Sequence, residues 1–109
     1  MFIVDRKPTF THTVKVQVPV DGGFDTQTFK AKFNVLPVDE VKNYDLKSGS
    51  ASTEFLIRAV DSMSDLADAN GEPLSYNDDV RDALLGLAYV RLALTRTYFE
   101  AVSGAQVGN

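Results

Sequence analysis

Few side chains in this chain could perform chemistry, and their spacing does not assemble them into a catalytic set. His12 is the only histidine among 109 residues, and there is no cysteine. Hydrolytic triads need a positioned base beside the nucleophile, and no serine here lies in a G-x-S-x-G elbow. His12 lies on the same side of an alternating segment as Val14, which indicates a residue at the start of a strand. The sequence therefore predicts a protein that is not an enzyme and uses no cofactor.

Two pairs of adjacent carboxylates are interpreted as helix starts. Consecutive helical side chains point about 100° apart, so Asp39 and Glu40 do not converge as an acid–base couple. The same argument applies to Asp78 and Asp79, which follow a potential helix cap at Asn77. The helix macrodipole favours acidic side chains at that position, so a structural role explains both pairs.

The segment Asp68-Ala69-Asn70-Gly71 has part of the composition of a calcium-binding loop. Such a loop needs an oxygen ligand at position 1, Gly at position 6 and Glu at position 12. With Gly71 at position 6, position 1 is Leu66 and position 12 is Asn77. Neither fits, so the segment predicts a turn and no metal site.

The first third of the chain predicts an antiparallel β-hairpin. Apolar residues alternate with polar ones over residues 11–20 and again over 28–36, which is the period of a half-buried strand. Residues 21–25 contain Gly22 and Gly23 and predict a longer loop between the strands. Pro19 is expected at a strand edge or bulge. A hairpin alone is marginal in water, so helices must cover its apolar face.

The remaining residues predict an α+β fold in which the hairpin packs against three to four short α-helices. The chain is expected to form a single domain, residues 1–109, with the hairpin in 1–37, a helical part in 38–104 and a frayed tail in 105–109. Helical spacing, caps and turn residues predict the following order: one or two helical turns in 38–46, a mobile loop in 47–52, a helix in 53–64, a turn in 68–73, a helix from the Asn77 cap to Gly86, and a helix in 89–102.

The last helix is apolar on two faces. One face combines Val90, Leu94, Thr97, Tyr98 and Ala101. The other combines Tyr89, Leu92 and Phe99. Either the helix is sandwiched and both faces are core, or the second face is a surface that contacts another protein.

Charge and hydropathy restrict the classes of partner. The formal net charge is −4 and the sequence pI is about 4.8, which argues against nucleic acid as the main partner. Six acids lie between Asp65 and Asp82, with only Arg81 among them. A solvated helix start explains most of that run, and a docking patch for a basic partner is the alternative. No apolar run reaches the length of a membrane span, so we expect an intracellular protein outside the membrane.

Residues 53–104 resemble the small tail assembly chaperones of long-tailed, siphovirus-type bacteriophages and prophages. The matching segments are Thr53-Glu-Phe-Leu-Ile-Arg58, Asn70-Gly-Glu-Pro-Leu74, Tyr76-Asn77, Val80-x-x-x-Leu84-Leu85 and Tyr89-Val90-x-x-Ala93-Leu94-x-x-x-Tyr98-x-x-Ala101. The hairpin also fits members of this group, through Phe29-Lys-Ala-Lys-Phe33 and Val38-Asp-Glu40. Many members carry a Trp after the first helix, whereas this chain has Ser64-Asp65-Leu66 there and no Trp.

The resemblance implies a non-enzymatic helper in phage tail morphogenesis. Proteins of this family keep the long, helical tape measure protein soluble and assist assembly of the tail tube protein around it. The resemblance places the protein in the host cytoplasm and outside the mature virion. The expected partners are the tape measure protein, the tail tube protein and further copies of the chain itself, with no nucleic acid and no membrane.

The expected partner-binding residues are Tyr89, Leu92 and Phe99 on the second face of the last helix, together with Asp78 and Asp79. The alternative function is a structural component of the virion, namely a tail completion or head–tail joining protein.

Overall fold

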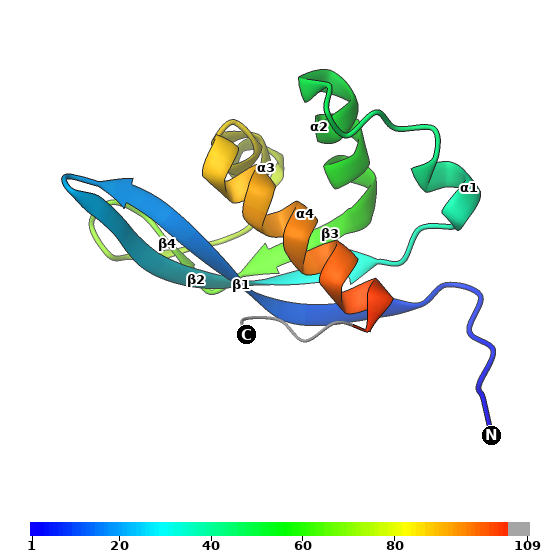
Figure 1. Cartoon of the computed structure of the whole chain (residues 1–109). Helices are drawn as coiled ribbons and strands as arrows, with labels where there is room; N and C mark the ends of the chain where they lie inside the picture. Colours follow the sequence, from blue (N-terminus) through cyan, green and yellow to red (C-terminus); the bar gives the residue numbers. More distant parts are fainter. Residues whose placement is uncertain (105–109) are drawn as a thin grey trace.

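Two long strands form an antiparallel hairpin on which the rest of the chain is built. In this computed structural model, which describes residues 1–104 apart from the side chain of Ala51, β1 is Thr9–Val20 and β2 is Gly23–Asn34. The predicted frayed tail lies outside the described residues. The α+β prediction is confirmed, because four helices accompany this hairpin (Figure 1).

The hairpin turn is tighter than the predicted loop. Val20 pairs with Gly23, so only Asp21 and Gly22 lie between the strands. Gly22 has a φ of 80°, a left-handed conformation that glycine adopts without a steric penalty. Residues 23–25 belong to β2, and the expectation of a longer loop over 21–25 was therefore wrong.

The alternation of the two strands separates a covered face from a solvated one. Val14, Val16, Phe29, Ala31 and Phe33 are buried on the covered face. The polar residues between them are exposed, as the period of two predicts. β1 is an edge strand of the three-stranded sheet, a position that tolerates the missing N–H of a proline at residue 19.

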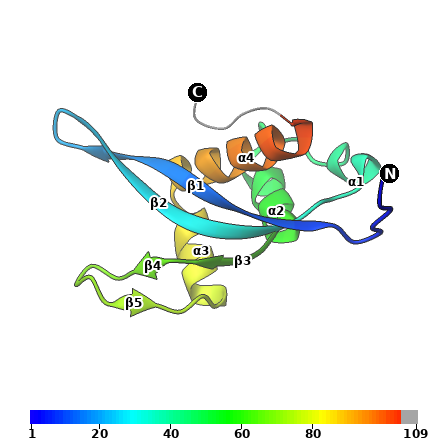
Figure 2. The ribbon, with the colours of Figure 1, turned by 90° about the horizontal axis from the view of Figure 1, so that it is seen from below.

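The helices lie on the covered face of the sheet (Figure 1, Figure 2). Their bounds are Val38–Val41 for α1, Gly49–Ala59 for α2, Asp78–Leu85 for α3 and Ala88–Ser103 for α4. Three short strands accompany them: β3 Val60–Ser64, β4 Leu66–Ala67 and β5 Pro73–Leu74. The segment predicted as the helical part therefore also contributes to two sheets.

The helix predicted over residues 53–64 ends at Ala59, and the chain continues as β3. β3 pairs with Lys30–Phe33 of β2. Its backbone groups are therefore satisfied by hydrogen bonds to the edge of the sheet, where a helix would satisfy them within the segment. The amide of Asn34 donates to the carbonyl of Arg58 at 3.3 Å, which satisfies one acceptor at the helix end. Val60 and Met63 are buried in β3, and the sequence pattern alone also fitted a helix.

The loop predicted over residues 47–52 is also replaced, because α2 begins at Gly49. Arg91 of α4 donates hydrogen bonds to the carbonyl of Gly49 and to the hydroxyl of Thr53. It also donates to the carbonyl of Leu85 at the end of α3, at 3.2 Å. One guanidinium of α4 thus contacts both the first turn of α2 and the end of α3.

Tyr98 of α4 lies at the centre of the core. Its side chain is 1% exposed, and its hydroxyl oxygen accepts a hydrogen bond from the backbone N–H of Leu36 at 3.0 Å. The rings of Phe55 and Phe33 lie 5.3 and 5.9 Å from it, centroid to centroid. These contacts hold α4 and α2 against the same part of the sheet.

Replacing Tyr98 with Phe should lower the free energy of unfolding by about 1–3 kcal/mol, because the buried N–H of Leu36 loses its acceptor. Urea denaturation would show the loss as a lower midpoint with an unchanged slope. Tyr44→Phe is the matched control, since the Tyr44 hydroxyl donates to Glu40 at a half-buried site. An equal loss in both variants would contradict the special role of Tyr98.

An ion pair connects α1 to the end of α2. The Nε and Nη2 atoms of Arg58 donate to the two carboxylate oxygens of Glu40, each at 2.8 Å. These bonds lower the pKa of the Glu40 carboxyl below its ordinary value of 4.5. Because this pKa is lower in the folded than in the unfolded state, the ion pair stabilises the folded protein above about pH 4.5. That contribution is lost as the pH falls through the folded-state pKa.

Glu40→Gln should therefore be less stable than the wild type at pH 7 and should lose less of its stability on acidification below pH 4.5. Urea midpoints measured from pH 7 to pH 3 would test this difference. The neighbouring exposed residue supplies the control, Asp39→Asn. Parallel pH profiles for the wild type and Glu40→Gln would show that the ion pair does not contribute.

Candidate functional site

The structure separates the residues predicted to bind a partner. Of the three on the second face of α4, only Leu92 is exposed, at 65%. Phe99 is half-buried and its ring stacks on that of Phe55 at 5.5 Å. Tyr89 is half-buried and lines a hollow beside the hairpin. The three therefore do not form one exposed apolar patch.

The remaining candidates for chemistry are occupied by structural contacts. The ring of His12 is half-buried and meets Phe10 edge to face at 5.0 Å. Glu40 is bound to Arg58. The carboxylate of Asp68 accepts hydrogen bonds from the backbone N–H groups of Asn70 and Glu72, at 2.9 and 3.0 Å. Within residues 1–104, no group of His, Asp and Glu side chains is placed to hold a metal ion.

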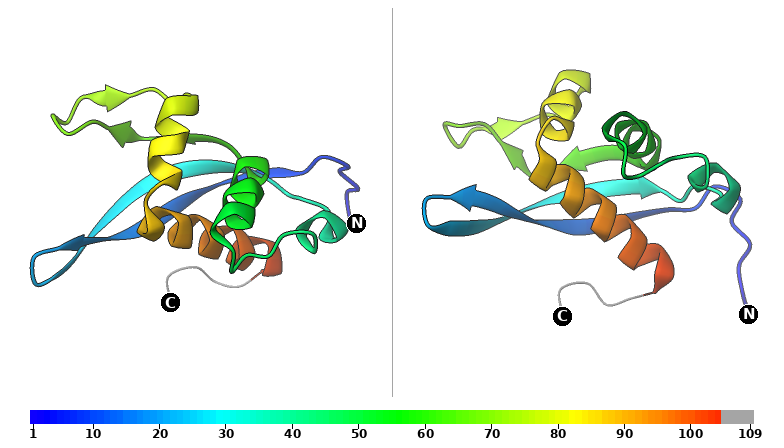
Figure 3. Two further views of the ribbon diagram at one scale, coloured as in Figure 1. Left: turned by 90° about the horizontal axis from the view of Figure 1, so that it is seen from above. Right: turned by 45° about the horizontal axis from the view of Figure 1, so that its top comes forward.

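The feature that could bind another molecule is an apolar groove between α3 and the β4–β5 hairpin. We call it the α3 groove, and define it by the two adjoining hollows that share Leu66, Ala67, Leu84 and Leu87. The hollow toward β1 and β2 has a volume of about 370 Å³, and the one toward β5 about 280 Å³. The β4–β5 hairpin extends alongside the long hairpin with α3 close to it (Figure 3).

Small residues leave the α3 groove open. Ala67 of β4 and Ala83 of α3 line it, and neither side chain is large enough to fill it. Leu74 and Leu87 each remain 39% exposed at its margin. Apolar side chains gathered in an open hollow favour binding of another apolar group.

Hydrogen bonds within residues 68–72 hold the turn of the β4–β5 hairpin. The backbone N–H of Asp68 donates to the carbonyl of Glu72 at 2.9 Å, and Gly71 has a φ of 81°. Asp65 precedes β4 with a φ of 60°, an uncommon conformation that Asp tolerates better than most residues. The turn predicted over 68–73 is therefore confirmed over residues 68–72, whereas Pro73 belongs to β5, and the two flanking strands were not predicted.

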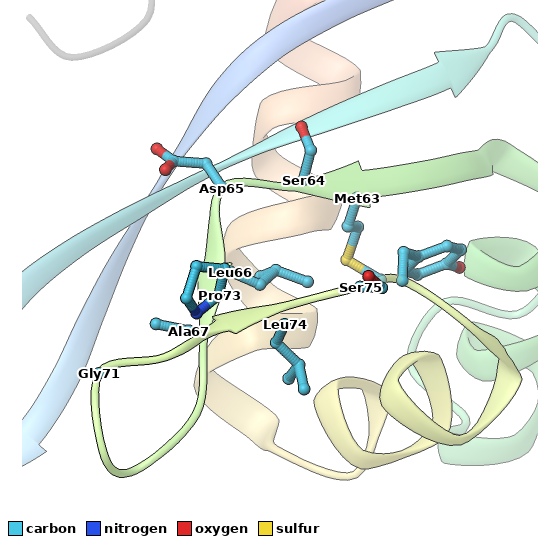
Figure 4. A pocket seen from close by; sticks show the side chains of 10 residues that line it. Met63, Ser64, Asp65, Leu66, Ala67, Gly71, Pro73, Leu74 and Ser75 are labelled. Carbon is cyan, nitrogen blue, oxygen red and sulfur yellow. The ribbon is translucent and has the colours of Figure 1, made fainter.

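A third hollow, which adjoins the α3 groove at the β4–β5 hairpin, has a volume of about 530 Å³ (Figure 4). Figure 4 shows Asp65 pointing away from the side chains of Leu66 and Leu74. Burial raises the pKa of the Tyr76 hydroxyl at this hollow.

The wall formed by α3 follows the predicted cap. Asn77 accepts a hydrogen bond from the backbone N–H of Val80 at 2.9 Å, and Asp78 and Asp79 lie in the first turn. Arg81 contacts Asp78 at 3.5 Å and Asp82 at 3.1 Å. α3 ends at Leu85, immediately before Gly86, as predicted.

The α3 groove has an acidic margin. Asp65 and Asp68 line the hollow toward β1 and β2, and Asp79 lines the hollow toward β5. Among the described residues that line either hollow there is no Lys or Arg. The acidic run seen in the sequence thus surrounds an apolar surface, an arrangement that would attract an apolar segment carrying positive charges.

The predicted site residues and the α3 groove overlap in part. Tyr89 and Asp79 line the groove, whereas Leu92 and Phe99 do not. The sequence reasoning missed the groove because it did not identify β4 and β5. Asn70-Gly71 between Leu66-Ala67 and Pro73-Leu74 was the available signal, since Asn-Gly favours hairpin turns.

Comparison of the chain with protein-family models, with curated proteins and with solved structures found no match. None of the helices in the described part of the chain is long and apolar enough to cross a membrane.

Two substitutions on α4 distinguish core from surface. Phe99→Asp should lower the free energy of unfolding by about 2 kcal/mol, roughly half the cost of truncating a fully buried Phe, because Phe99 is half-buried on Phe55. Leu92→Asp should change it by less than about 0.5 kcal/mol, because that side chain is exposed. Thermal denaturation followed by circular dichroism measures both. Equal stability of the two variants would place Phe99 on the surface.

Proposed function

We propose that the protein is a non-enzymatic tail assembly chaperone of a long-tailed bacteriophage or prophage, and that it binds helical segments of the tape measure protein. The α3 groove carries this proposal, because it is an open apolar surface on a small domain. The sequence resemblance over residues 53–104 supplies the biological setting.

The dimensions of the groove suit a short length of helix. α3 has eight residues and is therefore about 12 Å long at 1.5 Å per residue. About two turns of a partner helix match that length, and an amphipathic helix presents one apolar stripe over two turns. Covering that stripe would keep an aggregation-prone helix from associating with other copies of itself.

Co-expression provides the test. The tagged protein is produced together with the tape measure protein of the same phage or prophage, and the soluble fraction is purified through the tag. The wild type should bring the tape measure protein into the soluble fraction and co-elute with it. The double variant Leu74→Asp/Leu87→Asp should lose most of this recovery, because it places two charges in the α3 groove.

Two controls separate the groove from other surfaces. Val38→Asp alters an apolar residue that is 71% exposed on α1, away from the groove, and should behave like the wild type. Leu92→Asp tests the exposed part of the α4 surface in the same assay. If the wild type leaves the tape measure protein insoluble and unbound, the chaperone proposal is wrong. A stoichiometric band in purified particles would then favour a structural tail component.

A further inference from the structure

The chain begins with an apolar segment that the body of the protein does not cover. Phe2, Ile3 and Val4 are 88%, 83% and 74% exposed. They precede Arg6 and Lys7, which are exposed as well. We call residues 1–7 the arm, which leaves the sheet beside the start of β1 (Figure 1). Three consecutive large apolar side chains in water favour a partner that covers them.

The arm and the α3 groove have complementary chemistry. The arm offers an apolar run followed by two cations, with Asp5 between them. The groove offers apolar walls with Asp65, Asp68 and Asp79 on its margin. Apolar contact at the centre with opposite charges at the rim is the usual arrangement of a specific interface.

The arm cannot place its whole apolar run in the groove of its own chain. Pro8 is fixed, because its carbonyl accepts a hydrogen bond from the backbone N–H of Val35 at 3.0 Å. Phe29, which lines the groove, pairs with Val14, six residues along β1 from Pro8, or about 20 Å. Fully extended, the chain from Pro8 spans about 14 Å to Val4 and about 22 Å to Phe2, so Val4 falls short of even the near part of the groove. In Figure 2 the arm lies at the right of the molecule, whereas α3 lies near its centre and the β4–β5 hairpin at the lower left.

We propose that the arm of one copy of this chain binds in the α3 groove of a second copy, with Arg6 and Lys7 facing the acidic margin. The contact is head to tail, since the arm and the groove are different surfaces. Each copy in such a contact keeps one free arm or one free groove, so association continues into a ring or an open chain. The arm then competes with the tape measure helix for the same groove. The competition rests on the proposed function, whereas the self-association does not.

Size-exclusion chromatography with light scattering tests the contact on the full chain. The wild type should exceed the monomer mass of 12.0 kDa, increasingly at higher concentration. The arm variant Phe2→Asp/Ile3→Asp and the groove variant Leu74→Asp/Leu87→Asp should each be monomeric. Val38→Asp should associate like the wild type. Circular dichroism checks that each variant is folded, and the arm variant should keep wild-type stability because its side chains are exposed.

Mixing the two variants gives the decisive result. The groove variant retains an intact arm and the arm variant retains an intact groove, so the mixture should form a dimer that neither forms alone. A wild type that is monomeric at every accessible concentration would overturn the proposal. So would an arm variant with the wild-type mass, or a mixture of folded variants that stays monomeric.

The same variants distinguish this proposal from the proposed function. In the co-expression assay, the arm variant should recover at least as much tape measure protein as the wild type, because its groove has no competing arm. If the wild type fails to bind the tape measure protein while the mixture still dimerises, self-association stands and the chaperone function does not. If the tape measure protein binds while the wild type stays monomeric, the reverse holds.

Discussion

The packing of Tyr98 is the constraint on which the arrangement of the helices depends. Its ring lies among the aromatic side chains of the sheet and of α2, and its hydroxyl accepts the N–H of Leu36 where the chain leaves β2. A buried aromatic residue with a satisfied polar end has little freedom to shift. Tyr98 therefore sets the position of α4 against the sheet, and α4 in turn limits where α2 and α3 can lie.

Arg91 extends this constraint to the candidate site. Its guanidinium connects the first turn of α2 and the last turn of α3 through backbone carbonyls. α3 is thereby held at one wall of the α3 groove, while the β4–β5 hairpin forms the other. The groove stays open because small side chains, Ala67 and Ala83, line both walls. An unfilled apolar surface of this kind is suited to binding another apolar group.

Acidic side chains lie on the margin of this groove. Arg81 balances part of the acidic run on α3, while Asp65, Asp68 and Asp79 remain on the groove margin. Acidic residues around an apolar surface increase the rate at which a basic amphipathic segment associates, and disfavour acidic partners. The tape measure helix and the arm of a second copy are the two occupants proposed for this surface. They cannot occupy one groove together, so self-association would regulate its availability.

Local sequence determined the elements whose signals lie within a few residues. The alternation of apolar and polar residues predicted the hairpin. Asn77 and Gly86 marked the ends of α3, and Asp68 to Gly71 marked a turn, because caps and turns depend on neighbouring backbone groups. Tertiary structure decided the rest. Residues 60–64 became β3 because β2 offered an open edge, and the first turn of α2 packs where Arg91 of α4 can contact it. The α3 groove exists only where these distant segments meet, so no single stretch of sequence contains it.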